Sequence, residues 1–448
     1  MKYFYSLIFT TLFIFIYSIQ SKAQSREIIT IAGMGVGGFS GDGYSAQAAM
    51  LNGPNDVAVD LAGNVYIEDF YNFRIRKVLR YGSIVTFAGN GLNGNTGDGG
   101  IATNAEFRPN GVATDKHGNV YISDYAFSQI RKVNTLGIIA TFAGGGIAGY
   151  SGDNYPATSA LLSHPQGMTM DKKMNLYFAD VCNHVIRKID STGIITTIAG
   201  NHIRAWGGDL GLAINASLDS PYSVAKDKWN TIYIADYGNN IVRKIDTFGV
   251  ITTLAGTGFY GYTGDNGPAA LATFNKPTGV AVDTAGNVYI ADSRNNVIRM
   301  IDTLGKITTI VGNSWAGFSG DNGLAIGANL NNPQTIAIDT FGSIFIADAN
   351  NERVRKVYWS TEGVSKVAAT AQINAYPNPF NNKITIEGIN NEDVISISDI
   401  TGRNINVDII SKFQNKQVLT INNLISGMYF IQVTSKDGLL KATLKITK

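Results

Sequence analysis

The sequence has 448 residues, of which 44% are hydrophobic and 16% charged, with 36 lysines and arginines against 34 aspartates and glutamates. A net charge of +2 without a basic block excludes the usual signature of a nucleic-acid-binding protein. Cys182 is the only cysteine, which excludes an intramolecular disulfide, so packing has to stabilise the fold. The 50 glycines and 10 prolines fall at repeated positions and indicate the turns of an all-β protein.

The first 23 residues predict a cleavable signal peptide. Lys2 precedes an apolar run from Phe4 to Ile19, and the small residues Ser21 and Ala23 form a cleavage site before Gln24. A membrane anchor is the alternative, but the run is shorter than the roughly 20 apolar residues that a span needs. No other stretch of the sequence is apolar enough to cross a bilayer, so we expect no transmembrane segment in the mature chain.

One segment of the sequence occurs six times. An apolar run of the form NVYIAD ends in an aspartate, and an arginine follows seven residues later. The aspartates are Asp69, Asp124, Asp180, Asp236, Asp292 and Asp348, and the arginines are Arg76, Arg131, Arg187, Arg243, Arg299 and Arg355. Because the spacing is so regular, the sequence predicts a repeat architecture.

Each repeat predicts four strands. In the fifth repeat they fall at 278–283, 287–292, 297–302 and 307–312, separated by short turns that contain glycine. The second strand is apolar on both faces, as expected when both are covered, whereas the third and fourth alternate. Small residues in the first strand suit sheets that converge on an axis, and we expect burial to fall from the first strand to the last. Six such units predict a six-bladed β-propeller over residues 24–357.

The ends of the repeat array indicate how the ring closes. The first repeated element, 28–33, matches an outermost strand but has no blade before it, and the last unit ends at 354–357 without that strand. We therefore expect the N-terminal strand to complete the sixth blade, which removes two exposed sheet edges. A strand at 364–368 is the alternative, and it matches the pattern less well.

These repeats resemble the NHL-repeat propellers of bacteria. The shared pattern is ITTIAGxGxxGYTGDxGPAxxAxxNxPxGVAVDxxGNVYIADxxNxxIRxID, and it extends from Ile28 to about Val357. The resemblance is specific for the fold, because the pattern recurs six times. It is not specific for an activity, since similar propellers bind peptides, glycans or nucleic acids, act as sensors, or are lyases or lactonases.

The C-terminal part, 375–448, resembles a second family. A linker at 358–374 precedes strands expected at 383–388, 394–399, 418–421, 428–434 and 441–447. The segment opens with the motif Tyr376-Pro377-Asn378-Pro379-Phe380. It is similar to the type A C-terminal sorting domain of the Bacteroidetes type IX secretion system. The alternative is an ordinary immunoglobulin-like module, which has the same small β-sandwich fold. The resemblance implies the type IX machinery as a partner and a secreted or cell-surface product.

Each long connection between blades carries an aspartate, and in five repeats an aromatic residue stands three positions before it. The aspartates are Asp42, Asp98, Asp153, Asp209, Asp265 and Asp321, and the aromatic residues are Phe39, Tyr150, Trp206, Tyr262 and Phe318. Propeller connectivity places this loop and the turn after NVYIAD on one face. Aromatic faces and carboxylates together predict a binding surface. The alternative is that both rings stabilise loops, which the sixfold repetition favours.

The Asp-x-x-Asn-x-x-x-Arg element predicts a structural network rather than an active site. A buried aspartate, asparagine and arginine at the ends of the second and third strands would satisfy one another's charges and donors. The second repeat departs from the pattern, with Asn95 in place of the aromatic residue and Phe127 in place of the asparagine. Such broken symmetry marks either a specific ligand contact or drift.

The residues that an enzyme would need are not grouped in the sequence. Cys182 has no evident base partner, and the histidines occupy positions that are not equivalent in the repeats, namely His117, His164, His184 and His202. We therefore assign no catalytic residues and no cofactor, although loop carboxylates can bind calcium. The sequence predicts a monomeric extracellular protein whose propeller binds a glycan, peptide or protein. The alternatives are a calcium-dependent lactonase or lyase on the same scaffold, and a structural adhesin.

Overall fold

The computed structural model describes residues 25–360 and, in the C-terminal region, 373–378, 380–390, 392–399, 403–405, 408–413, 416–421, 426–434 and 440–448. The proposed signal peptide, with its cleavage site at Ala23 and Gln24, lies outside these residues. The alternative closing strand at 364–368 and Pro379 of the sorting motif also lie outside them.

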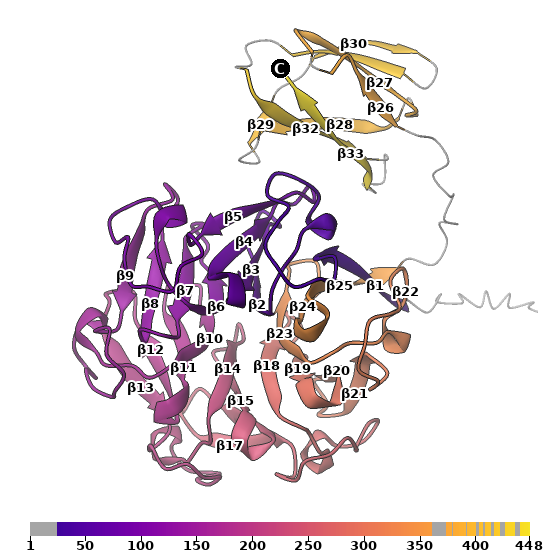
Figure 1. The fold of residues 1–448 in the computed structure, drawn as a ribbon. Helices are drawn as coiled ribbons and strands as arrows, with labels where there is room; N and C mark the ends of the chain where they lie inside the picture. The colour runs from indigo at the N-terminus through magenta and orange to yellow at the C-terminus, as the bar shows by residue number, and fades with distance from the viewer. Residues whose placement is uncertain are drawn as a thin grey trace, which may run out of the picture.

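Residues 25–360 form the predicted six-bladed β-propeller, in which each blade is an antiparallel sheet with its first strand nearest the axis (Figure 1). The first three blades comprise β2 (Pro54–Val59), β3 (Val65–Asp69), β4 (Arg74–Val78) and β5 (Ile84–Ala88); β6 (Pro109–Thr114), β7 (Val120–Asp124), β8 (Gln129–Val133) and β9 (Ile139–Ala143); and β10 (Pro165–Met170), β11 (Leu176–Asp180), β12 (Val185–Ile189) and β13 (Ile195–Ala199). The next two comprise β14 (Pro221–Lys226), β15 (Ile232–Asp236), β16 (Ile241–Ile245) and β17 (Ile251–Ala255); and β18 (Pro277–Val282), β19 (Val288–Asp292), β20 (Val297–Ile301) and β21 (Ile307–Val311).

The sixth blade closes the ring with the N-terminal strand. It contains β23 (Pro333–Ile338), β24 (Ile344–Asp348) and β25 (Arg353–Ser360), and β1 (Ser25–Ala32) pairs antiparallel with β25. A two-residue strand, β22 (Gly323–Leu324), pairs with the other edge of β1. The propeller extends beyond the predicted end at 357, because Tyr358–Ser360 continue β25 opposite the start of β1.

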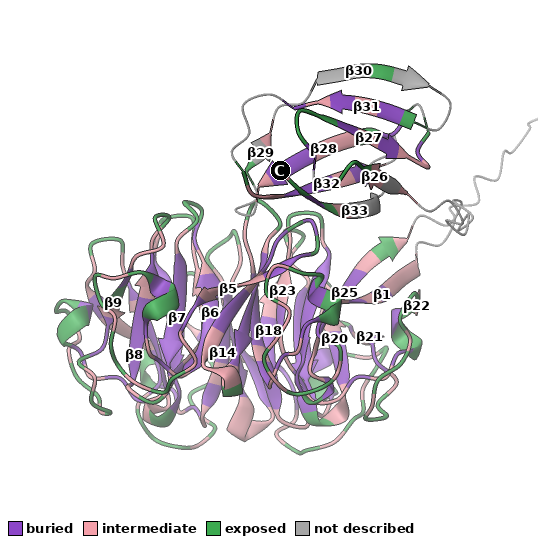
Figure 2. Ribbon diagram, turned by 45° about the horizontal axis from the view of Figure 1, so that its top comes forward, coloured by how far each residue is buried: buried purple, intermediate pink, exposed green. Residues whose placement is uncertain are grey.

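The hydrophobic core lies between the blades rather than in one central mass. Six clusters of buried residues each join two neighbouring blades, and the purple strands of Figure 2 mark them. The expected fall in burial from the first strand to the last is wrong in one respect, because the second strand is the most buried. All five residues of β3 are buried, whereas β10 and β23 are only partly buried. The first strands line an axial channel of about 300 Å³, which leaves them partly accessible.

Each repeat contains short 3₁₀ turns. One set lies in the long loops, at η1 (Ala46–Ala48), η3 (Ala102–Asn104), η4 (Ala157–Ser159), η6 (Ala213–Asn215), η8 (Ala269–Leu271) and η10 (Ala325–Gly327). The other set follows the aspartate of the second strand in five blades, at η2 (Phe70–Asn72), η5 (Val181–Asn183), η7 (Tyr237–Asn239), η9 (Ser293–Asn295) and η11 (Ala349–Asn351). No helix in the described part of the chain is long and apolar enough to span a bilayer.

The C-terminal region forms the predicted small β-sandwich. One sheet contains β26 (Asn374–Tyr376), β27 (Lys383–Glu387), β31 (Lys416–Thr420) and β30 (Asp408–Phe413), and the other contains β29 (Asn404–Ile405), β28 (Val394–Asp399), β32 (Met428–Thr434) and β33 (Leu440–Thr447). The sequence predicts five of these strands and misses β26, β29 and β30. Phe380 of the sorting motif is buried in the core, and Asn378 Oδ1 accepts a 2.8 Å hydrogen bond from Thr447 N.

Candidate functional site

The six repeated arginines are buried, and each pairs with the aspartate of the long loop in its own repeat. Arg76 is fully buried and its Nη2 lies 2.7 Å from Asp42 Oδ1, while its Nη1 lies 3.2 Å from Asp69 Oδ2. The same double pairing recurs in four further repeats, at Arg187 with Asp153 and Asp180, Arg243 with Asp209 and Asp236, Arg299 with Asp265 and Asp292, and Arg355 with Asp321 and Asp348. The two sets of carboxylates that the sequence treats separately therefore meet on one guanidinium.

The loop aromatic residues cover the outer side of these arginines. The guanidinium of Arg76 lies 4.8 Å from the ring centre of Phe39, and Arg187 lies 4.8 Å from that of Tyr150. The other three residues lie similarly, with Tyr262 over Arg299, Phe318 over Arg355, and Trp206 Nε1 donating to Thr253 Oγ1. These residues are 39–45% exposed, and Arg74, His202 and Arg353 also contact the rings of Phe39, Tyr150 and Phe318. This geometry gives the predicted binding residues a packing role in the loops.

The second blade lacks the asparagine that completes the network elsewhere. In the first blade, Asn72 Nδ2 donates to both Asp69 Oδ1 and Gly38 O, which ties the turn to the long loop on the same face. Phe127 cannot make these bonds. Arg131 still pairs with Asp98, but Arg131 Nη1 and Asp124 Oδ2 are buried without a hydrogen-bond partner among the described residues. The departure that the sequence shows at Phe127 therefore weakens the network.

The repeats differ most at one end of the axial channel, where the first strands begin and the second strands end. We call this end the axial mouth. Three positions of each repeat lie there. They are the residue before the proline that opens the first strand, the residue after that proline, and the residue after the aspartate that ends the second strand. These positions hold Gly53, Arg108, His164, Ser220, Lys276 and Asn332; Asn55, Asn110, Gln166, Tyr222, Thr278 and Gln334; and Phe70, Tyr125, Val181, Tyr237, Ser293 and Ala349.

Seven of these side chains form two contacting groups, which we together call the aromatic crescent: Phe70, Arg108, Tyr125 and His164 in one group, and Tyr222, Tyr237 and Lys276 in the other. The Arg108 guanidinium lies 4.7 Å from the Phe70 ring centre and 5.4 Å from that of Tyr125. Tyr125 contacts the His164 ring, with centroids 4.3 Å apart. The Tyr222 and Tyr237 rings stack with centroids 4.7 Å apart, and Lys276 Nζ lies 4.6 Å from the Tyr237 ring centre. Burial first, and then nearby Tyr237 and Tyr125, raise the pKa of Tyr222.

The remaining part of the mouth carries smaller and polar side chains. Thr278 Oγ1 donates to Gln334 O, and Ser293 Oγ donates to Pro333 O, so both hydroxyls connect the fifth and sixth blades. Asn332 and Gln334 complete this side. The axial mouth is therefore asymmetric, because aromatic and cationic side chains occur in the first five blades and the sixth blade has none at these three positions.

Cys182 has a partner that the sequence does not reveal. His164 Nδ1 lies 3.0 Å from Cys182 Sγ, because both residues stand at the axial end of the third blade. The expectation of no base partner is therefore wrong. Burial raises the pKa of the Cys182 thiol, to which Asp180 adds, and burial lowers the pKa of His164. Both shifts favour the neutral pair, whereas a nucleophilic thiolate needs the opposite shift.

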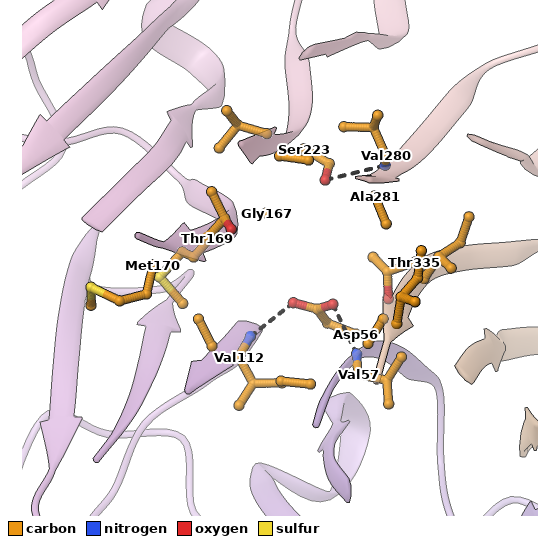
Figure 3. A pocket seen from close by; sticks show the side chains of 18 of the residues that line it. Asp56, Val57, Val112, Gly167, Thr169, Met170, Ser223, Val280, Ala281 and Thr335 are labelled. Atoms are coloured by element: carbon orange, nitrogen blue, oxygen red, sulfur yellow. Dashed lines mark hydrogen bonds between the residues drawn. The ribbon is translucent and has the colours of Figure 1, made fainter. Parts of the chain in front are cut away.

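Two buried carboxyls of the first blade stand beside the channel. Asp56 points into the channel, where its oxygens accept hydrogen bonds of 2.8 Å from Val57 N and Val112 N (Figure 3). Burial raises the pKa of Asp56 to about 6. Glu68 is fully buried, and neither carboxylate oxygen has a hydrogen-bond partner of good geometry among the described residues. Burial, Asp56 and Asp69 raise the pKa of Glu68 well above its ordinary value.

Sequence reasoning missed the aromatic crescent and Glu68. The signal was available in the repeats, because aligning them by their aspartates shows which columns vary. At the position of Glu68 the other repeats have serine or alanine, at Ser123, Ala179, Ala235, Ala291 and Ala347. The described residues contain no group of three or more histidine, cysteine, aspartate or glutamate side chains arranged to hold a metal ion.

Three family models match the chain. The secretion system C-terminal sorting domain matches residues 374–447, and the NHL repeat matches residues 51–78. The teneurin NHL domain matches 89–148, 146–206 and 260–317. These matches fall within both regions that the sequence analysis assigned by resemblance.

Among curated proteins, mouse teneurin-4 is 29% identical over 290 residues, which is 54% of this chain but only 10% of teneurin-4. The Arabidopsis thaliana protein SUPPRESSOR OF QUENCHING 1 is also 29% identical, over 61% of this chain and 27% of its own length. The chain therefore spans only a small part of these relatives.

Among solved structures, a Bacteroides thetaiotaomicron protein of unknown function superposes with a TM-score of 0.57 at 19% identity, covering 75% of this chain and 76% of that one. An auxiliary nutrient binding protein from Bacteroides ovatus gives a TM-score of 0.54 at 14% identity, covering 75% and 78%. At these identities the likeness shows a shared fold.

Proposed function

This chain is an NHL-repeat β-propeller protein with a C-terminal type IX secretion sorting domain, which directs it to the cell surface or the medium. We propose that its propeller is a binding module for an extracellular glycan, peptide or protein. The ligand contacts the aromatic crescent. The type IX machinery engages the C-terminal domain during export.

The observation that carries this proposal is the contrast between the two rings of the propeller. The arginine network repeats around the ring, as a scaffold does, and it uses its carboxylates and one face of each aromatic residue for packing. The crescent draws on the first five blades and does not repeat from blade to blade. Tyr125, Tyr222 and Tyr237 are only half-buried there, although aromatic rings are among the side chains that contribute most to binding.

The relative of similar fold from Bacteroides ovatus is described as an auxiliary nutrient binding protein. A capture role of this kind is compatible with an extracellular location. It also requires no catalytic group, and the neutral Cys182–His164 pair offers no activated nucleophile.

The test is a thermal-shift screen of the exported protein against glycan and peptide panels, repeated with Tyr222→Ala. A ligand at about 100 times its Kd adds roughly 2.7 kcal/mol to the free energy of unfolding, which shifts Tm by a few degrees. We expect the shift to disappear in Tyr222→Ala and to persist in Tyr260→Ala, which removes an exposed tyrosine outside the crescent. A ligand that binds Tyr222→Ala as tightly as the wild type would overturn the site.

Turnover of a lactone in the presence of calcium would instead select the enzyme alternative. The same screen therefore includes calcium alone and calcium with a lactone substrate. The adhesin alternative requires a protein ligand in the peptide and protein panel.

A further inference from the structure

We infer that the aromatic crescent recognises a glycan whose sugars carry carboxylate groups, such as a polyuronate. This inference rests on the proposed function and names the ligand class for the same site. It follows from two cations at the mouth that have no acidic partner among the described residues.

The first cation is Arg108, which is held between aromatic rings of two neighbouring blades. Its guanidinium lies over Phe70 of the first blade and Tyr125 of the second. Within the described part of the chain it forms no ion pair, and its Nε is buried without a hydrogen-bond partner. The exposed Arg204, in contrast, lies 2.9 Å from Asp219. Arg108 is thus held by stacking, and its terminal nitrogens form no ion pair within the described residues.

The second cation is Lys276, which occupies the equivalent position of the fifth blade. Its Nζ lies 4.6 Å from the Tyr237 ring centre, and no carboxylate among the described residues lies within ion-pair distance. Arg108 and Lys276 flank the tyrosines and His164 of the crescent. A stacked arginine keeps its fork of N–H donors in one orientation, which suits a planar carboxylate.

The acidic groups at the mouth do not cancel these charges. Asp219 is paired with Arg204, and Glu352 accepts a 2.6 Å hydrogen bond from Gly53 N beside Phe70. Asp56 and Glu68 are buried, and neither forms an ion pair with Arg108 or Lys276 in the described part of the chain. Both cations of the crescent therefore keep charges that no carboxylate pairs within the described residues.

A carboxylated sugar fits all three kinds of group at the mouth. Its apolar C–H face can stack on the tyrosine rings, and its carboxylate can accept from Arg108 or Lys276. Its hydroxyls can bond to the amides of Asn332 and Gln334 across the mouth. A peptide that binds by strand addition would instead need a free sheet edge for its backbone, and the crescent offers side chains.

The experiment compares an oligogalacturonate with its methyl ester and with a neutral cello-oligosaccharide by titration calorimetry on the whole exported protein. We expect the free acid to bind at least about tenfold more tightly than the ester, which is about 1.4 kcal/mol. Arg108→Gln and Lys276→Gln should each lose about tenfold in affinity for the acid only. Raising the salt concentration should weaken binding of the acid and not of neutral sugars.

The matched control is Arg80→Gln. Arg80 is also exposed and stacked, with its guanidinium 4.9 Å from the Tyr81 ring centre, but it lies in a turn outside the mouth. Its loss should leave binding unchanged. Melting curves of each variant identify any that fails to fold, and Lys276→Gln then serves in place of Arg108→Gln.

The possible outcomes separate this inference from the proposed function. Equal binding of the acid and its ester, lost in Tyr222→Ala, would overturn the acidic ligand and leave the crescent as the site. Binding of acidic peptides or sulfated glycans but not of uronates would also overturn the inference. If Tyr222→Ala weakens the binding of no ligand, both the inference and the proposed function are overturned.

Discussion

At the scale of single residues, the buried arginines are the groups on which the fold depends most. Arg243 is fully buried and bonds to Asp209 Oδ1, Gly207 O and Ser217 O. Arg243→Ala leaves Asp236 buried without its counter-charge, so we expect a loss of about 2 to 4 kcal/mol in the free energy of unfolding. Urea denaturation measures it.

Arg204→Ala is the matched control for this prediction. Arg204 is 71% exposed and pairs with Asp219 at the surface. Exposed pairs contribute roughly 0 to 1 kcal/mol. Equal losses in the two variants would contradict the proposed role of the network.

The raised pKa of Glu68 should make the stability of the fold depend on pH. Its folded pKa lies above its unfolded value of about 4.3, so protonated Glu68 favours the folded state. That contribution is fully present below the unfolded pKa and is lost as the pH rises through the folded pKa. Glu68→Gln should therefore be more stable than the wild type at pH 8 and similar to it at pH 4. Melting temperatures across this range measure the difference, and parallel pH profiles would refute the assignment.

The sequence shows the substitution at Glu68 but not its consequence. The first repeat has Glu68 directly before its aspartate, where four of the other repeats have alanine and one has serine. Whether that position faces solvent or a neighbouring blade depends on the twist and packing of the sheets. Only the structure shows that both oxygens are buried.

At the scale of the elements, one substitution in the second blade should restore a hydrogen bond that the other blades have. Phe127 occupies the position at which Asn72 and Asn183 bridge to the long loop. Phe127→Asn supplies a donor for Asp124 Oδ2, and we expect a gain of roughly 1 kcal/mol in the free energy of unfolding. Chemical denaturation of the variant tests this. A loss would show that packing of the Phe127 ring outweighs the missing hydrogen bonds.

Substituting a loop aromatic residue distinguishes a packing role from a ligand-binding role. Trp206 covers Gly258 and donates to Thr253, so Trp206→Ala should lower stability by about 1 kcal/mol. It should leave ligand affinity unchanged, because Trp206 lies outside the crescent. Calorimetry with the ligand found in the screen checks the second part, and a lost affinity would place the ligand on the loop ring.

Repetition explains why the elements were predictable while the crescent was not. The strands 287–292 and 307–312 were predicted within one residue of β19 and β21, because each hydrophobic pattern recurs in every repeat. The crescent depends on residues such as Arg108 and Tyr222, which appear once each and are far apart in the sequence. Their contact follows from the closed ring, which local patterns do not encode.

At the scale of the whole molecule, the ring holds both ends of the repeat array. β1 completes the sixth blade beside β25, as the unmatched first element of the sequence predicted. Closure brings the first and sixth blades together at the axis, where Thr335 Oγ1 donates to Asn55 O. The same closure gathers six different first-strand ends around one mouth. A repeated scaffold thereby supports a single asymmetric site.

The measurement that tests this account most directly is hydrogen–deuterium exchange of the exported protein with and without a ligand from the screen. We predict slower exchange in the mouth segments 108–110, 125–127, 164–166, 220–222 and 237–240, with no change in the loops 39–44, 206–211 and 262–267. Slower exchange confined to those loops would contradict a binding site at the aromatic crescent.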